Sequence, residues 1–233
     1  MPSFSDFDTR QYRTVDARTG YGDWAATYER TVEDEMDIAL LERVAAVPWT
    51  EAREVVDLGC GSGRSGVWLK RKTTATVDGV DLTPEMLAMA QEKGVYRRLI
   101  EADIAATGLP SEAYDLAVTS LVDEHLADLA PLYREAWRLV RPGGSYVLVG
   151  FHPHFMMASG MPTHFKNAAG EEVAISTHLH LLSDHVTAAV GAGWRLTEMH
   201  ERIIDEAWIA LKPKWERYRQ QPISFVCVWR RPA

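Results

Sequence analysis

From about residue 31 onward, short apolar runs typical of buried strands alternate with segments typical of helices. Short apolar runs predict buried strands over 53–58, 75–80, 96–102, 114–121 and 145–151, and two late strands are expected over 194–204 and 222–230. Helices are expected over 64–72, about 130–140 and 183–192, the last capped by Ser183. Another is expected over 84–93, where Thr83 is the N-cap, Pro84 the first helical residue and Glu85 a first-turn acid. A first helix is expected to start at Thr31 and to present Met36, Leu40, Val44 and Val47 before Pro48.

This alternation predicts a doubly wound α/β fold. Strands joined by helices need right-handed crossovers, which give a mostly parallel sheet with helices on both faces. We expect seven strands, with the last one antiparallel. In such folds the ligand binds at the carboxyl ends of the strands.

We expect residues 1–233 to form a single domain, because no linker or repeat interrupts them. The segments 1–30, 151–180 and 205–221 fall outside the alternation. Long connections in compact domains are usually functional, so we predict an N-terminal lid and two insertions over the ligand site. Residues 161–180 are expected to form a hairpin flap that turns at 166–170.

Composition narrows the class of protein. Of 233 residues, 46% are hydrophobic and 25% are charged, as in soluble globular proteins. A net charge of −8 without a block of Lys or Arg argues against a nucleic-acid partner. No apolar run approaches the roughly 18 residues of a membrane span, and the polar N-terminus is unlike a signal peptide. We therefore expect a cytoplasmic protein with no membrane partner. Two distant cysteines, Cys60 and Cys227, exclude a disulfide framework.

A glycine loop follows the first predicted strand. Its sequence, VVDLGCGSG over 55–63, contains Asp57, Gly59, Gly61 and Gly63. Glycines allow a tight turn and a close approach of ligand to backbone. Gly61, Gly63 and Gly66 also fit G-x-G-x-x-G, with Asp81 twenty residues after Gly61, so a dinucleotide site is an alternative. A carboxylate inside the motif, however, suits a ligand with an ammonium group and repels a pyrophosphate.

Five features in order resemble the class I S-adenosylmethionine-dependent methyltransferases of the small-molecule type. They are DLGCGSG at 57–63, GVDLTPEML at 79–87, Asp103-Ile104, YDL at 114–116 and LVRPGG at 139–144. The resemblance is close over about 20–150 and looser over 180–230. It implies a Rossmann-like fold, S-adenosyl-L-methionine as cofactor, and methyl transfer to a small-molecule acceptor.

The resemblance also implies roles for single residues. Asp57 would face the methionine ammonium group, and the loop backbone with Cys60 would pack against the methionine. Asp81 would accept from both ribose hydroxyls, since a carboxylate has two acceptor oxygens. Asp103 would accept from the adenine amino group. The remaining cofactor contacts implied are Ile104, Leu82, Met86 and Leu121.

The segment from Gly20 to Tyr28 resembles the entry helix of small-molecule methyltransferases. By this resemblance the Tyr28 hydroxyl would reach the carboxylate of the cofactor. Tyr21 and Trp24 are expected to roof the pocket.

Two histidines are candidates for the catalytic base. His125 and His152 each follow a central predicted strand, where the transferred methyl should point. An acceptor hydroxyl is a weak nucleophile until its proton is removed, and histidine is the natural base near neutral pH. We expect His152, or failing that His125, to be this base, with Asp123 or Glu124 orienting it.

Histidine pairs raise the question of a metal site. His152/His154 and His178/His180 form H-x-H pairs, but no ligand signature accompanies them, and we expect no metal.

Apolar residues in the flap region, namely Phe155, Met156, Met157, Met161 and Phe165, favour a partly apolar or aromatic acceptor. O-methylation is the leading hypothesis. C- or N-methylation, or a lyase or cyclisation reaction of the same cofactor, remain alternatives.

Overall fold

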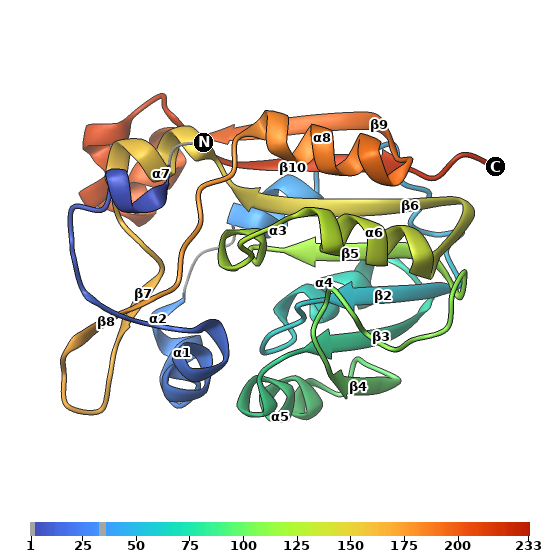
Figure 1. The fold of residues 1–233 in the computed structure, drawn as a ribbon, viewed down its shortest axis with the longest axis horizontal. Helices are drawn as coiled ribbons and strands as arrows, with labels where there is room; N and C mark the ends of the chain where they lie inside the picture. Colours follow the sequence, from blue (N-terminus) through green and yellow to red (C-terminus); the bar gives the residue numbers. More distant parts are fainter. Residues whose placement is uncertain (1–2, 33–35) are drawn as a thin grey trace.

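The computed structural model describes residues 3–32 and 36–233, which build a seven-stranded sheet and a smaller three-stranded one (Figure 1). The large sheet has the order β4 (Arg98–Glu101), β3 (Thr76–Asp81), β2 (Glu54–Leu58), β5 (Tyr114–Ser120), β6 (Val140–Phe151), β10 (Pro222–Arg230) and β9 (Arg195–Ile203). The first five of these strands are parallel, and β10 is antiparallel to both of its neighbours. The predicted doubly wound, Rossmann-like fold is therefore confirmed.

Alternate residues of the strands face two different helix layers. Val56 and Leu58 pack with α6 (Ala130–Leu139) and α8 (Leu182–Ala192). Val55 instead packs with α3 (Met36–Leu41) and α4 (Arg64–Lys72), and α5 (Pro84–Lys93) contacts β3 and β4. Because both strand faces are buried, the central strands are continuous apolar runs.

Most predicted elements are present, and three differ from the sequence prediction. β6 begins at Val140, before the expected 145, because the glycine turn stays within the strand. Ser183 lies inside α8 and is not its cap; the Asp184 carboxylate instead accepts the Leu181 amide at 2.8 Å.

The helix expected from Thr31 differs as well. Part of it, 33–35, lies outside the described residues. Downstream, α3 ends at Leu41 and does not continue to Pro48. The amides of Ala45 and Ala46 donate to the Glu198 carboxylate on β9 in place of helical carbonyls.

The N-terminal segment and the flap form one structural unit. β7 (His164–Lys166) and β8 (Glu172–Ile175) make the predicted hairpin, and β1 (Arg13–Val15) pairs with β8 in parallel. Helices α1 (Ala17–Trp24) and α2 (Tyr28–Thr31) pack against this small sheet, with Trp24 stacked on Phe165 at 5.6 Å between ring centroids. Figure 1 shows this unit beyond the arrowheads of the parallel strands.

A third group of elements lies near the end of β6. α7 (Pro153–Ser159), α9 (Glu206–Leu211) and the 3-10 helix η3 (Pro213–Tyr218) share an apolar cluster that includes Phe155, Trp208 and Trp215. Two short 3-10 helices, η1 (Phe4–Asp6) and η2 (Asp123–His125), complete the described elements.

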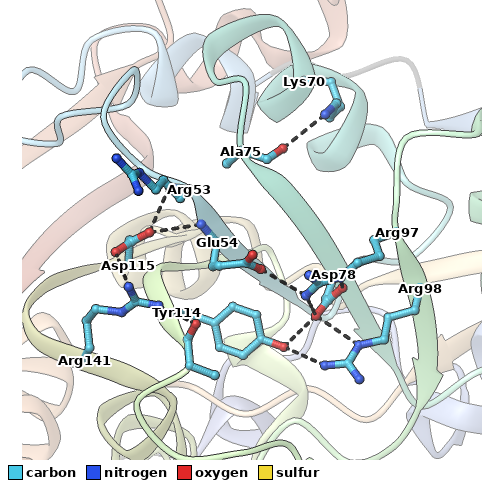
Figure 2. A network of polar contacts seen from close by, with 11 residues as sticks. Arg53, Glu54, Lys70, Ala75, Asp78, Arg97, Arg98, Tyr114, Asp115 and Arg141 are labelled. Atoms are coloured by element: carbon cyan, nitrogen blue, oxygen red, sulfur yellow. Dashed lines mark hydrogen bonds and ion pairs between the residues drawn. The ribbon is translucent and has the colours of Figure 1, made fainter.

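Charged side chains fix the opposite end of the sheet, away from the glycine loop (Figure 2). The fully buried Asp78 accepts hydrogen bonds from Arg97 at 2.7 Å, Arg98 at 3.0 Å and Tyr114 at 2.7 Å. Burial raises the pKa of Asp78, but these hydrogen bonds outweigh it and the net effect lowers the pKa. This network holds β3, β4 and β5 together.

Candidate active site

One large cavity, about 840 Å³, opens at the carboxyl ends of β2, β3 and β5. Its walls come from the glycine loop, the N-terminal helices, the flap, α7 and η3. Sequence-predicted residues that line it are Tyr21, Tyr28, Gly59, Cys60, Gly61, Asp81, Leu82, Met86, Asp103, Ile104, Leu121 and His125. The fold thus brings together side chains from segments far apart in the chain.

Two glycines of the loop have a positive φ but differ in their surroundings. Gly59 has a φ of +76°, and a Cβ there would lie 2.5 Å from Val122 Cγ2. Gly61 has a φ of +50°, and a Cβ there would meet no described atom within 4 Å. The loop is therefore packed from below at Gly59 and open to the cavity at Gly61. Cys60 is buried, which raises the pKa of its thiol, so it is protonated and not a nucleophile.

Asp81 sits at the end of β3 with both carboxylate oxygens fixed. Oδ2 accepts the Gly61 amide at 2.8 Å, and Oδ1 accepts the Thr83 amide at 2.9 Å. Burial raises the pKa of Asp81, and these amides oppose the rise. Each oxygen has a second lone pair, so the carboxylate can still accept from a ligand in the cavity.

Asp57 lies on β2 just before the loop and is not among the described residues that line the cavity. Its Oδ2 accepts from Ser65 and Tyr96, both at 2.7 Å, and its Oδ1 has no partner among the described residues. Burial raises the pKa of Asp57 to about 6. This carboxyl therefore links β2 to α4 and to Tyr96.

The four residues expected to contact adenine also line the cavity: Leu82, Met86, Asp103 and Ile104. Met86 and Ile104 are buried, whereas Leu82 is 38% exposed. Asp103 accepts the Ala105 amide at 2.8 Å through Oδ1. Their contacts with adenine remain predictions.

Asp37 and Arg64 line the cavity and were not singled out from the sequence. Arg64 donates from Nη2 to Asp37 Oδ2 at 2.7 Å, and the Ser120 hydroxyl donates to the same oxygen at 2.8 Å. Arg64 directly follows Gly63, which is a signal that sequence reasoning missed. Asp37 carries no such signal, because only the packing of α3 brings it to the loop.

His125 occupies the end of the cavity beyond β5, with both ring nitrogens hydrogen-bonded. Nδ1 lies 2.8 Å from the Ser176 carbonyl oxygen, which can only accept, so Nδ1 carries the proton. Nε2 then accepts from the Tyr21 hydroxyl at 3.0 Å. Burial lowers the pKa of His125, which keeps the ring neutral.

Glu124 lies beside this pair as a buried carboxyl in the cavity wall. Its Oε1 is 3.6 Å from His125 Nε2, and its Oε2 has no hydrogen-bond partner among the described residues. Burial raises the pKa of Glu124 well above its usual range. A buried, unpartnered oxygen at this point provides a place for a polar group of a ligand.

His152 has a different environment from the one predicted. Its Nδ1 accepts the His154 amide at 3.1 Å and caps α7, and its Nε2 lies 2.8 Å from Glu201 Oε1. It falls outside the described residues that line the cavity, whereas His125 lies in the wall. Of the two candidate bases, His125 alone is among the described residues that line the cavity.

The H-x-H pairs do not assemble a metal centre in the described part of the chain. Ring centroids of His152 and His154, and those of His178 and His180, are 6.5 Å apart. Across residues 3–32 and 36–233, no cluster of three or more His, Cys, Asp or Glu has metal-binding geometry. The same residues contain no helix long and apolar enough to span a membrane.

The wall formed by the end of β6, α7, the flap and η3 is mainly apolar. The residues that form it are Phe151, Phe155, Met156, Met161, Phe165 and Trp215. Met157, expected in this wall, packs instead with the cluster around Phe4. Lys212 and Lys214 also line the cavity on this side.

Sheet order, glycine loop and cavity together define a doubly wound α/β protein whose ligand site spans the ends of its central strands. Residues 56–148 match the family described as the methyltransferase domain. A solved S-adenosylmethionine-dependent methyltransferase from Mesorhizobium loti is 26% identical, with a TM-score of 0.64 over 83% of this chain and 96% of that one. Residues 56–148 therefore match a methyltransferase domain, and the fold as a whole is similar to that of a solved S-adenosylmethionine-dependent methyltransferase.

Curated relatives are similar over part of their length. Trans-aconitate 2-methyltransferase of Variovorax paradoxus is 37% identical over 123 residues, which cover 52% of this chain and 48% of that protein. Malonyl-(acyl-carrier protein) O-methyltransferase of Halorhodospira halophila is 30% identical over 177 residues, which cover 74% of this chain and 56% of that protein. The chain spans about half the length of the curated relatives it matches.

The cavity fits S-adenosylmethionine, the cofactor of the methyltransferases to which this chain is similar. Asp81 offers carboxylate oxygens for a ribose, and open space beside Gly61 admits a ligand against the loop. Asp37 Oδ1 is buried without a partner among the described residues, as expected of a group that meets a charged ligand.

Proposed function

We propose that this protein transfers the methyl group of S-adenosylmethionine to an oxygen atom of a small, partly apolar acceptor, with His125 as the base. The observation that carries the proposal is the Tyr21–His125 hydrogen bond, at 3.0 Å, in the same cavity as the glycine loop and Asp81.

Bound S-adenosylmethionine supplies an electrophilic methyl group on a sulfonium, so the protein contributes positioning and proton removal. Asp81, Asp103 and the glycine loop would hold the nucleoside and the amino-acid part. The methyl would then point to the end of β5, where Glu124 and His125 lie.

Proton removal would pass through Tyr21. Its hydroxyl already donates to His125 Nε2, so the acceptor O–H proton moves to Tyr21 Oη while the Tyr21 proton moves to Nε2. With its proton removed, the acceptor oxygen would be able to take the methyl group that bound S-adenosylmethionine supplies. Burial raises the pKa of Tyr21 well above its ordinary value, so the phenol bridges the transfer and does not act as a base itself.

The wall composition supports the acceptor class. Phe155, Phe165 and Trp215 present ring surface on one side of the cavity. Apolar pockets with few polar groups recognise apolar bodies and use the polar groups for orientation. We infer an acceptor with an apolar or aromatic body whose hydroxyl reaches Tyr21. The name of the Halorhodospira relative, an O-methyltransferase, agrees with oxygen as the target.

Isotope transfer tests this function. The protein is incubated with methyl-labelled S-adenosylmethionine, with and without an extract of small metabolites, and the products are analysed by mass spectrometry. We expect label on one oxygen of a metabolite and an equal amount of S-adenosylhomocysteine. Methylthioadenosine formed without extract would instead show a lyase or cyclisation, and label on nitrogen or carbon would overturn the oxygen assignment.

A further inference from the structure

We propose that the methyl acceptor carries an anionic oxygen group, separate from the oxygen that is methylated, and that Lys214 in the cavity wall binds this group. This inference rests on the proposed function, because it needs a methyl acceptor in the cavity. It adds a charge to the apolar or aromatic body inferred above. It also orients the acceptor, with its hydroxyl at Tyr21 and its anionic group at η3.

Lys214 is a cation of the cavity wall that forms no ion pair within the described part of the chain. Lys166, which also lines the cavity, is by contrast paired with Glu172 at 3.7 Å. The Lys214 ammonium instead lies 5.9 Å from the ring centroid of Trp215. A ring face attracts a cation weakly and accepts no conventional hydrogen bond from it, so the ammonium donors can meet a ligand anion.

Trp215, the next residue, provides a second donor. Its side chain lines the cavity and is 7% exposed, and its Nε1 has no hydrogen-bond partner among the residues that the structure describes. A buried N–H without an acceptor is costly. A carboxylate or a phosphate has more than one acceptor oxygen, so one such group can accept from an ammonium and from an indole N–H.

Packing holds Lys214 beside the apolar wall. Trp215 stacks on Phe155 with ring centroids 4.7 Å apart, and both belong to the apolar cluster shared by α7, α9 and η3. Figure 1 shows the 205–221 segment beside α7. The backbone at Lys214 is therefore fixed at the cavity, whereas its side chain, on a flexible four-carbon stem, can follow a ligand. An apolar body with one anionic end matches these two surfaces.

The charge of the whole chain makes a local cation important for such a ligand. The net charge is −8, so the overall field of the protein does not attract an anion. Asp81 and Asp103 also line the cavity and would repel an anionic group placed near them. An anionic acceptor therefore needs a positive group at the part of the wall where its charge lies.

Arg217 is a matched cation on the same short helix, outside the cavity wall. Its Cζ lies 4.6 Å from the ring centroid of Tyr218, and within the described residues it forms no ion pair either. Unlike Lys214, it is not among the described residues that line the cavity. Arg217 therefore serves as the control for a change of charge on η3.

The test begins with the metabolite extract. The extract is separated on an anion exchanger at pH 7, and the retained and unretained fractions are each incubated with the wild type and methyl-labelled S-adenosylmethionine. We expect label on a compound of the retained fraction, and the labelled product should also be retained, because its anionic group is not the one methylated. Phosphatase treatment of that fraction then separates a phosphate, whose removal abolishes label transfer, from a carboxylate, which survives.

Kinetics with the purified acceptor test the residue. Lys214→Met should raise the KM for the acceptor on the order of fivefold, the upper range for an exposed charge pair, and the loss should appear in KM and not in kcat. Lys214→Arg keeps the charge and should restore KM to within about twofold of wild type. Lys214→Glu should raise KM more than Lys214→Met does. Arg217→Met should leave KM at the wild-type value.

Four results would contradict the inference, and they differ from failure of the proposed function. An acceptor in the unretained fraction would overturn it, as would a labelled product that is no longer retained. A wild-type KM in Lys214→Met, or an equal rise in Arg217→Met, would overturn it too. No label transfer from any fraction would instead mean that the proposed function itself fails. Because Lys214 is exposed, its variants change the contact without removing buried structure.

Discussion

Tyr21 and His125 are 104 positions apart in the chain, yet the Tyr21 hydroxyl donates to His125 Nε2 at 3.0 Å. Tyr21 belongs to the N-terminal α1, and His125 ends the short helix after β5. The carbonyl of Ser176, which directly follows β8 in the flap, accepts from Nδ1 of the same ring, so both covering segments contact this imidazole. The N-terminal segment and the flap thus complete the site that we assign to proton removal.

His125 should be essential for turnover. We expect His125→Gln to lower kcat by about 10²- to 10⁴-fold, the usual contribution of a general base. Cofactor affinity should change little, because His125 belongs to the acceptor end. His152→Gln is the matched control and should keep kcat within a few-fold of wild type, since its ring binds Glu201. Turnover in His125→Gln close to wild type would show that the acceptor needs no base, as for a carboxylate or amine.

The pH dependence of kcat should follow the same imidazole. Burial lowers the pKa of His125, so the neutral, proton-accepting form persists at pH values where an ordinary histidine is partly charged. We expect kcat to be level from neutral to about pH 9 and to fall in acid with a midpoint below histidine's usual value of about 6.5. A midpoint above that value would contradict His125 as the base.

Tyr21 and His125 should act as a unit. If the proton passes through the Tyr21 hydroxyl, Tyr21→Phe should slow turnover on the order of 10²-fold, within the range for general-base catalysis. The double variant with His125→Gln should be about as slow as the slower single one, because residues of one unit are not additive. Rate losses that multiply would show two independent roles, and the relay would be wrong.

Asp81 should contribute to cofactor affinity and not only to the fold. We expect Asp81→Ala to weaken S-adenosylhomocysteine binding by about 1.5–3 kcal/mol, measured by calorimetry. Asp115→Ala is a matched control, because Asp115 also accepts two backbone amides, of Arg53 and Glu54, at the opposite end of β2 (Figure 2). Equal affinity losses in the two variants would point to a general loss of structure.

Asp78 should act on stability alone. Replacing it with Asn removes a buried charge that accepts from Arg97, Arg98 and Tyr114, and should lower the free energy of unfolding by about 1.5–3 kcal/mol. Because the folded state lowers the pKa of Asp78, this stabilisation is present above the unfolded value of about 3.9 and is lost as pH falls through the folded value. Urea titrations of both proteins at neutral and acid pH measure it, and S-adenosylhomocysteine affinity at neutral pH should not change.

The parts of the molecule that sequence could predict are those with local causes. The strand ending at Leu58, the glycine loop and the helix between Thr83 and Gly94 all follow from neighbouring residues, and all are present. Asp81 could be placed at the cavity because it ends a buried parallel strand. The hairpin of β7 and β8 was also predictable from its turn.

The choice between the two histidines could not be made locally. Both follow a central strand, but the ring of His152 is turned toward Glu201, which only the pairing of β9 with β10 brings near. His125 is directed into the cavity by Ser176 and Tyr21, from two distant segments. Asp37 was missed for the same reason, since the packing of α3 sets its position. Long-range contacts therefore decide the details of the site.

Direct calorimetric titration of the purified protein with S-adenosylhomocysteine, and separately with NADH, tests the central claim that this cavity holds an S-adenosyl cofactor. Asp81 and the open loop at Gly61 predict one equivalent of S-adenosylhomocysteine bound per chain and no heat of binding for NADH. Binding of NADH without binding of S-adenosylhomocysteine would restore the dinucleotide interpretation of the glycine loop and contradict the account.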